Sequence, residues 1–174
     1  MSNFEGNMEN DIVNRVENSG LIQVSLDDFY PKGERVVFDI KELLHEGFVL
    51  IEKDLRAFVK QNNWSEFKDK YVSITCSADA IVPLWAFMLI AAHLKPFAKK
   101  VVLGNKSDLE KSIFENIFNT LDFSIYQDKG VIVKGCGKYP IPDSVVLDFA
   151  YRLQSVAKSV MFGEACSAVP LYKR

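Results

Sequence analysis

The feature that most constrains this fold is a series of matching residues separated by a constant spacing. Residues 64–70 resemble residues 123–129, with Asp69 matching Asp128 at a spacing of 59 positions, and two further matches keep that spacing: Pro83 with Pro142, and Gly104 with Gly163. Only the cysteine loop slips by one residue, where Cys76 matches Cys136. An ordered series of this kind predicts a duplicated structural unit, with repeats at 64–104 and 123–163.

Each repeat has the pattern strand, loop, helix, strand. Apolar runs predict the four strands, at residues 71–75, 101–104, 131–134 and 160–163. Pro83 and Pro142 suit the first helical position, where the missing N–H costs nothing. Right-handed crossovers then give parallel strands covered by helices. We predict an α/β fold, a three-layer sandwich with one mainly parallel sheet that holds all four strands.

The rest of the chain supplies a tail and an N-terminal extension. Residues 1–10 are polar and predict a disordered tail, which leaves 11–174 as a single α/β domain. Apolar runs at 21–26 and 35–38 predict an N-terminal β/α extension. A further helix over 109–121 links the repeats, with Ser107 or Asp108 as its N-cap.

Composition excludes several classes of protein. The chain has 174 residues, a net charge of −2 and a sequence pI near 5.7, which argues against nucleic acid or an anionic membrane as partner. The most apolar run, residues 80–94, is too short to span a bilayer and contains Pro83. Without a basic and apolar leader at the N-terminus, we expect a cytoplasmic protein with reduced thiols.

The three cysteines each follow a predicted strand of the repeats. Cys76, Cys136 and Cys166 come after the first, third and fourth strands. Because the carboxyl ends of parallel strands share one edge of a sheet, we expect the three thiols to meet there. Three thiolates could bind zinc, with Asp79 or Glu164 as fourth ligand, or an iron–sulfur cluster with one open iron. The sequence therefore predicts a metal site of Cys76, Cys136, Cys166, Asp79 and Glu164.

Other interpretations of the cysteines stay open. Free cysteine is among the most buried residue types, so the thiols could be structural in a non-catalytic interaction domain, a homodimer. A thiol-redox protein is a third possibility, since Cys76 and Cys136 precede helix N-termini, which lower thiol pKa values. No P-loop or dinucleotide fingerprint is present, and whether the protein is an enzyme is left open.

Several motifs resemble a known family. They are Asp28-Phe-Tyr-Pro, Arg35-Val-Val-Phe-Asp-Ile, Cys76-Ser-Ala-Asp-Ala-Ile-Val-Pro, Lys134-Gly-Cys and Gly163-Glu-Ala-Cys-Ser-Ala-Val-Pro-Leu-Tyr. Together they are similar to bacterial domain-of-unknown-function family 2480. The resemblance implies no established activity or substrate, but it implies a link to iron–sulfur cluster assembly. We therefore expect a cytoplasmic metal- or iron–sulfur-binding protein whose three-cysteine site lies at the C-terminal edge of the sheet.

Overall fold

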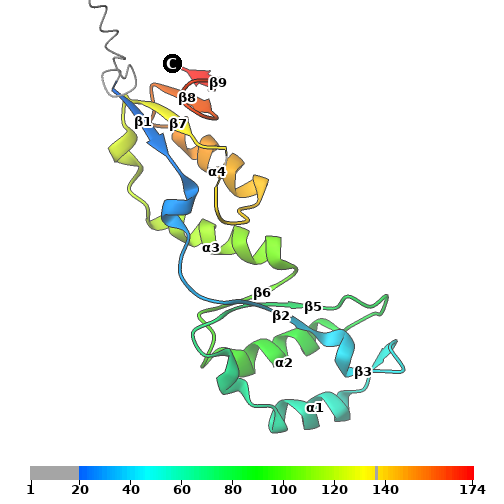
Figure 1. The fold of residues 1–174 in the computed structure, drawn as a ribbon. Coiled ribbons are helices and arrows are strands. Elements are labelled where there is room, and N and C mark those ends of the chain that lie inside the picture. Colours follow the sequence, from blue (N-terminus) through cyan, green and yellow to red (C-terminus); the bar gives the residue numbers. More distant parts are fainter. Residues whose placement is uncertain (1–19, 136) are drawn as a thin grey trace, which may run out of the picture.

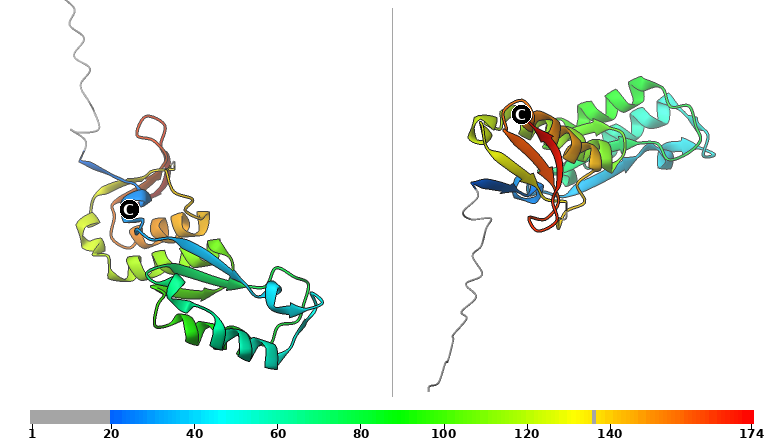
Figure 2. Two further views of the ribbon diagram at one scale, coloured as in Figure 1. Left: turned by 60° about the horizontal axis from the view of Figure 1, so that its bottom comes forward. Right: turned by 90° about the horizontal axis from the view of Figure 1, so that it is seen from above.

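The strands of the two predicted repeats lie in two separate sheets rather than one (Figure 1). The computed structural model describes residues 20–135 and 137–174. Sheet A has the order β1-β7-β8-β9, with bounds Leu21–Val24, Gly130–Val133, Ser159–Phe162 and Val169–Lys173. Sheet B has the order β2-β5-β6, with bounds Arg35–Asp39, Tyr71–Thr75 and Lys100–Leu103. Figure 2 shows the two sheets toward opposite ends of an elongated molecule.

Neighbouring strands are parallel, except that β9 runs antiparallel to β8. A short antiparallel hairpin is formed by β3 (Leu44–His45) and β4 (Val49–Leu50). The predicted α/β class with mainly parallel strands is therefore confirmed. The prediction that all four repeat strands share one sheet is wrong.

The N-terminal strands explain why the repeats are in different sheets. In sheet A, β1 pairs with one side of β7 while β8 pairs with the other. In sheet B, β2 and β6 flank β5 in the same way. A strand has two hydrogen-bonding edges, so β5 and β7 have none left with which to reach each other. The N-terminal extension was expected to belong to a single sheet. Its strands β1 and β2 instead belong to two different sheets.

Four α-helices cover the sheets. Their bounds are Glu52–Gln61 for α1, Leu84–Leu94 for α2, Lys106–Thr120 for α3 and Asp143–Leu153 for α4. Sheet B lies between α3 on one face and α1 with α2 on the other (Figure 1). Because α3 also packs against α4 of the sheet A part, it joins the two parts of the molecule. No helix of the described residues is long and apolar enough to cross a membrane.

Each sheet has its own apolar core. Alternate residues Val131 and Val133 of β7 are buried with Phe149 of α4, and α3 adds Phe114 and Phe118 to this core. The second core is formed by β5, α1 and α2, and its largest members include Ile74, Leu55, Ile90 and Leu94. The core of sheet A thus extends onto α3, which makes that helix part of both units.

Helix starts differ slightly from those expected. Asn105 is the N-cap of α3, because its side chain accepts hydrogen bonds from the N–H groups of Ser107 and Asp108. The Asp108 carboxylate in turn accepts from the Asn105 N–H and completes a capping box. The predicted caps Ser107 and Asp108 are therefore wrong by one turn.

Four short 3-10 helices complete the described part of the chain. Their bounds are Leu26–Phe29 for η1, Ile40–Leu43 for η2, Trp64–Phe67 for η3 and Phe123–Tyr126 for η4. Asp39 caps η2 by accepting the N–H of Lys41. Pro83 and Pro142 each directly precede a helix, one position earlier than expected.

Positions 59 residues apart have similar local geometry. Asp69 and Asp128 have positive φ values of 61° and 57°, and each donates its N–H to a carbonyl 3.0 Å away, of Phe97 and Val156 respectively. These likenesses concern local hydrogen bonds, so the duplication itself stays a prediction. The predicted tail at 1–10 and Cys136 lie outside the described residues.

Candidate functional site

A cavity of about 510 Å³ lies at the C-terminal edge of sheet A. The residues that follow β1 and β7 form one wall, the first turns of α4 form another, and Phe162 and Leu171 close it from β8 and β9. This edge is where open α/β sheets bind their ligands. Its lining is mostly apolar and consists of Ser25, Leu26, Asp27, Lys134, Gly135, Gly137, Tyr139, Ile141, Asp143, Val146, Leu147, Ala150, Phe162 and Leu171.

Two glycines shape this cavity. A Cβ on Gly135 would lie 2.9 Å from the Cζ atom of Phe162, and a Cβ on Gly137 would lie 2.5 Å from Oδ1 of Asp27. Real Cβ atoms do not approach neighbours so closely, so a side chain at either position would require the Phe162 ring or the Asp27 carboxylate to shift. The loop after β7 is thereby drawn close to β8 and to η1.

Asp27 fastens this loop. Its Oδ2 accepts the backbone N–H of Lys138 at 2.6 Å, and its Oδ1 accepts that of Tyr139 at 3.3 Å. Asp27 lies in η1, directly beyond β1, so the carboxylate ties the ends of two neighbouring strands together. Charge-assisted hydrogen bonds of this type are stronger than neutral ones, which gives the cavity a fixed wall.

Sheet B has a similar tie but no matching glycine. Asp39 accepts the N–H of Ser77 at 3.0 Å. Burial alone would raise the pKa of Asp39, but hydrogen bonds from Ser77 and Lys41, with the positive charge of Lys41, bring the pKa below its usual value. Cys76 corresponds to Gly135 by its position in the hydrogen-bond pattern. Near the end of each strand, one carbonyl accepts the N–H of a glycine, and Cys76 and Gly135 each lie two residues after the residue that carries this carbonyl.

Cys76 carries a side chain at the position where Gly135 has none. Its thiol is half-buried and packs against the core of sheet B, where it donates to the carbonyl of Ala78 at a distance of 3.8 Å. The spacing of 59 therefore pairs Cys76 with Gly135, and the inferred slip that paired Cys76 with Cys136 is not supported by the strand ends. The same turn carries a side chain in sheet B, whereas in sheet A the missing Cβ lets the ring of Phe162 approach the backbone.

On its other side, the cavity loop contacts a column of stacked side chains. The ring of Tyr139 stacks on Tyr30 with centroids 4.0 Å apart and planes 2° from parallel. The guanidinium of Arg35 lies 4.1 Å from the same Tyr30 centroid and 4.8 Å from that of Tyr71. Two groups so close must use opposite faces of Tyr30, so the order is Tyr139, Tyr30, Arg35, Tyr71.

Glu110 of α3 anchors this column. Its Oε1 accepts hydrogen bonds from the Tyr30 hydroxyl at 2.9 Å and from Arg35 Nε at 2.8 Å. Arg35 also donates to the carbonyls of Pro31 and Gly33. The pKa of Tyr30 is raised to about 12. Burial is the largest cause, and the hydrogen bond to Glu110 and the negative charge of Glu110 add to it. We call Tyr30, Arg35, Tyr71, Glu110 and Tyr139 the clamp, because they tie the β1–β2 connection and the cavity loop to α3.

The loop between the clamp and α4 separates two spaces. Ile141 lines the cavity at the edge of sheet A and also a second cavity of about 540 Å³ at the clamp. That second cavity is bordered by Tyr30, Arg35 and Glu110, whose polar atoms are already joined to one another. This second cavity is therefore a space within the contact between the two sheets. The first cavity, in contrast, has walls that are free to contact a ligand.

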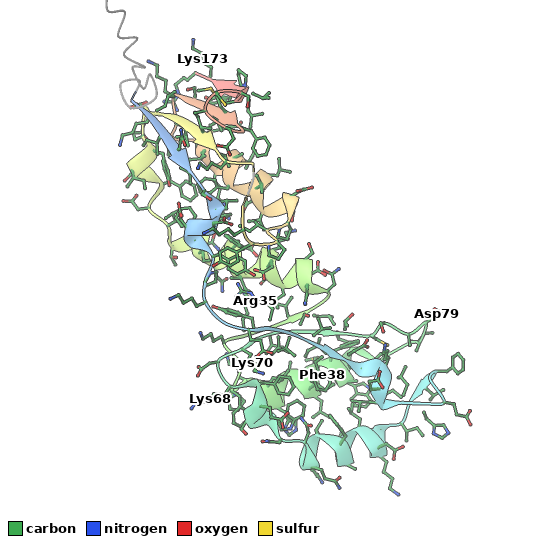
Figure 3. The ribbon with its side chains drawn as sticks, in the orientation of Figure 1. Arg35, Phe38, Lys68, Lys70, Asp79 and Lys173 are labelled. Atoms are coloured by element: carbon green, nitrogen blue, oxygen red, sulfur yellow. The ribbon has the colours of Figure 1, made fainter. Side chains whose placement is uncertain are left out.

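The structure does not bring the predicted metal ligands together. Cys76 follows β5 of sheet B, whereas Cys166 is exposed in a turn after β8 of sheet A. Asp79 and Glu164 are both exposed. Figure 3 shows Asp79 beyond the far end of sheet B, at the opposite end of the molecule from Lys173 in β9. The fifth predicted ligand, Cys136, lies outside the described residues.

The predicted metal- or iron–sulfur-binding function with a three-cysteine site is therefore wrong. Among residues 20–135 and 137–174, no three or more histidine, cysteine or acidic side chains are grouped so that they could hold a metal ion. The physical reason is the division of the strands, because ends of strands in separate sheets do not share an edge. The rival interpretations, an interaction domain with structural thiols or a thiol-redox protein, receive no better support.

Sequence reasoning missed the residues that build the cavity. Asp27, Gly135 and Gly137 are not among the site residues that were predicted from the sequence. A usable signal was present, because two glycines one residue apart directly after a buried strand indicate close approach of the backbone to another group.

Comparison with known proteins identifies a family but no function. The model of the family described as a protein of unknown function, DUF2480, matches residues 10–174. This confirms the resemblance that the motifs indicated. No curated protein and no solved structure shows significant similarity to the chain.

Proposed function

We propose that this chain, which belongs to the DUF2480 family of proteins of unknown function, binds a small and mainly apolar molecule at the C-terminal edge of sheet A. The observation that carries the proposal is the cavity bordered by Gly135, Gly137 and Phe162. Its volume of about 510 Å³ lies within the range of small-molecule sites, roughly 300–1,000 Å³. It also lies where ligands enter α/β sheets.

The lining favours binding through apolar contact. Side chains of Ile141, Val146, Leu147, Phe162 and Leu171 surround the space. Leu147 and Leu171 are also exposed to solvent, so the cavity opens to the surface through an apolar rim. An apolar molecule that entered would bury its own surface together with this rim. Removing apolar surface from water is favourable by about 25 cal/mol of free energy per Å².

Binding is a better description of this site than catalysis. Both oxygens of Asp27 accept backbone N–H groups, which assigns this carboxylate to holding the wall. The described lining residues include no histidine and no cysteine, and no hydrogen bond among them pairs the side chains of Ser25, Lys134 or Asp143 as nucleophile and base. We therefore assign the cavity a carrier or sensor role for its ligand.

A matched pair of tryptophan substitutions tests this proposal. Leu171 lines the cavity and is 50% exposed, whereas Leu103, in β6 of sheet B, is 54% exposed and lies away from it. Amide NMR spectra of the ¹⁵N-labelled full chain would be recorded during titration with indole and with phenethyl alcohol. We expect saturable shifts centred on Gly135, Gly137 and Ile141 that Leu171→Trp abolishes and Leu103→Trp leaves intact.

Two results would count against a binding role for the cavity. One is the absence of saturable shifts in the parent protein with either probe. The other is saturable binding that survives Leu171→Trp, which would place the site elsewhere. Amide spectra of the two unliganded variants show directly whether both remain folded.

A further inference from the structure

We infer that the ligand of this cavity carries a positive charge, as an amine attached to an apolar body. This inference rests on the proposed binding function and concerns the charge of its ligand. It follows from the charged residues that line the cavity. They are two carboxylates, of Asp27 and Asp143, and one ammonium group, of Lys134.

Lys134 lines the cavity, but the alternation of side chains along the strand puts its side chain on the face opposite Phe162. Val133 belongs to the core face of β7, together with Phe162 of β8. The strand geometry continues through Lys134, whose N–H donates to the carbonyl of Val24 at 2.9 Å. Since successive side chains of a strand alternate between faces, Lys134 points to the face opposite Phe162. Gly135 returns to the Phe162 face, as its close approach to that ring shows.

The two carboxylates remain on the cavity side. Oδ1 of Asp27 lies directly against the Cα of Gly137, as the 2.5 Å approach of a hypothetical Cβ there shows. A carboxylate has about four acceptor sites, and the two backbone N–H groups on Asp27 leave acceptor capacity for a ligand. Asp143 begins α4 and has no ion-pair partner among the described residues.

The start of α4 does not offset this negative charge. A helix N-terminus attracts anions, but Asp143 already places a carboxylate there. A carboxylate or phosphate on the ligand would therefore meet a like charge. No arginine is present among the described lining residues to form the paired hydrogen bonds that such groups favour. The site thus selects amines and rejects nucleotides and organic acids.

Three probes of one shape separate the charge of the ligand from its apolar body. Phenethylamine, phenethyl alcohol and phenylacetate share the phenyl ring and differ in a cationic, neutral or anionic end. In NMR titrations at low salt, we expect the amine to bind about tenfold more tightly than the alcohol, and the anion more weakly than both. Asp143→Asn should reduce the preference for the amine several-fold, and Asp54→Asn, at an exposed position of α1 beside sheet B, should leave it unchanged.

Each outcome of this series has one meaning. Equal binding of the three probes, or tighter binding of phenylacetate, would overturn the inference about charge while the cavity stands as a binding site. A loss of phenylacetate binding in Lys134→Met would also overturn it, because the ammonium group would then face the ligand. If no probe gives saturable shifts in the parent protein, the proposed binding function itself is overturned.

Discussion

The buried ion pair of the clamp provides the sharpest test of how the two sheets are held together. The Arg35 side chain is 11% exposed and the Glu110 side chain 6%, with Nε and Oε1 2.8 Å apart. Replacing Glu110 by glutamine keeps the shape of the side chain and removes its charge. The guanidinium then stays buried with only neutral acceptors, among them the carbonyls of Pro31 and Gly33.

The expected loss follows from burying a charge without its counterion. Breaking a buried pair by removal of one partner costs about 3–5 kcal/mol. The two carbonyl acceptors and the glutamine oxygen still solvate Arg35 in part, so we expect Glu110→Gln to lower the free energy of unfolding by about 2–4 kcal/mol. The double variant Arg35→Met with Glu110→Leu removes both charges and should cost less than the single change.

A solvent-exposed ion pair of the same length serves as the control. Nε of Arg56 and Oε1 of Glu52 are 2.7 Å apart in α1, but their side chains are 57% and 60% exposed. Exposed pairs one turn apart contribute about 0.3–0.5 kcal/mol, so Glu52→Gln should be nearly neutral. The comparison isolates burial, because charge type and distance are matched.

The position of the tryptophans makes the assay selective for one sheet. Both tryptophans of the chain, Trp64 and Trp85, lie in η3 and α2 beside sheet B. Urea unfolding followed by tryptophan fluorescence therefore reports sheet B, whereas circular dichroism also reports α4. In the parent protein we expect one coincident transition, and in Glu110→Gln two separated ones. A loss in Glu110→Gln no larger than that in Glu52→Gln would refute this account of the clamp.

Two further predictions concern buried polar groups. The pKa of Tyr30 is raised to about 12, above its usual value of 10.0. The folded state therefore holds the tyrosine proton more tightly than the unfolded state, and this contribution is complete below pH 10 and lost as the pH rises toward 12. It amounts to at most about 2.7 kcal/mol, at 1.36 kcal/mol per unit, and Tyr30→Phe should remove this alkaline slope from stability measured by urea unfolding. The buried Oγ of Ser73 has no hydrogen-bond partner among the described residues. Ser73→Ala should therefore raise the free energy of unfolding by up to about 1 kcal/mol, and the melting temperature with it. A lower melting temperature would show that the hydroxyl has a hydrogen-bond partner.

Local structure could be predicted from the sequence because its causes are local. The strand predicted at 71–75 matches β5, and that at 131–134 differs by one residue from β7, since short apolar runs between turn residues indicate buried strands. Pro83 and Pro142 correctly indicated the starts of two helices to within one residue. The homodimer expected from the sequence stays a prediction.

The partition into two sheets could not be predicted because strand pairing depends on distant residues. Periodicity shows that a segment is a strand, but it does not show which edge the strand pairs with. The pairs that decide the topology join Leu21 with Gly130 and Arg35 with Tyr71, over very different separations in the sequence. Each N-terminal strand occupies an edge of one repeat, and no local pattern of residues indicated that choice.

The candidate site was missed because attention went to the reactive side chain rather than to the space beside it. Cysteine suggests chemistry, whereas glycine contributes by the atoms it lacks. Strand ends with the same hydrogen bonds carry Cys76 in sheet B and Gly135 in sheet A, and the first packs into a core while the second lets the ring of Phe162 approach the backbone. Phe162 is one of the residues that line the cavity at the end of sheet A, so a search for ligands should begin there.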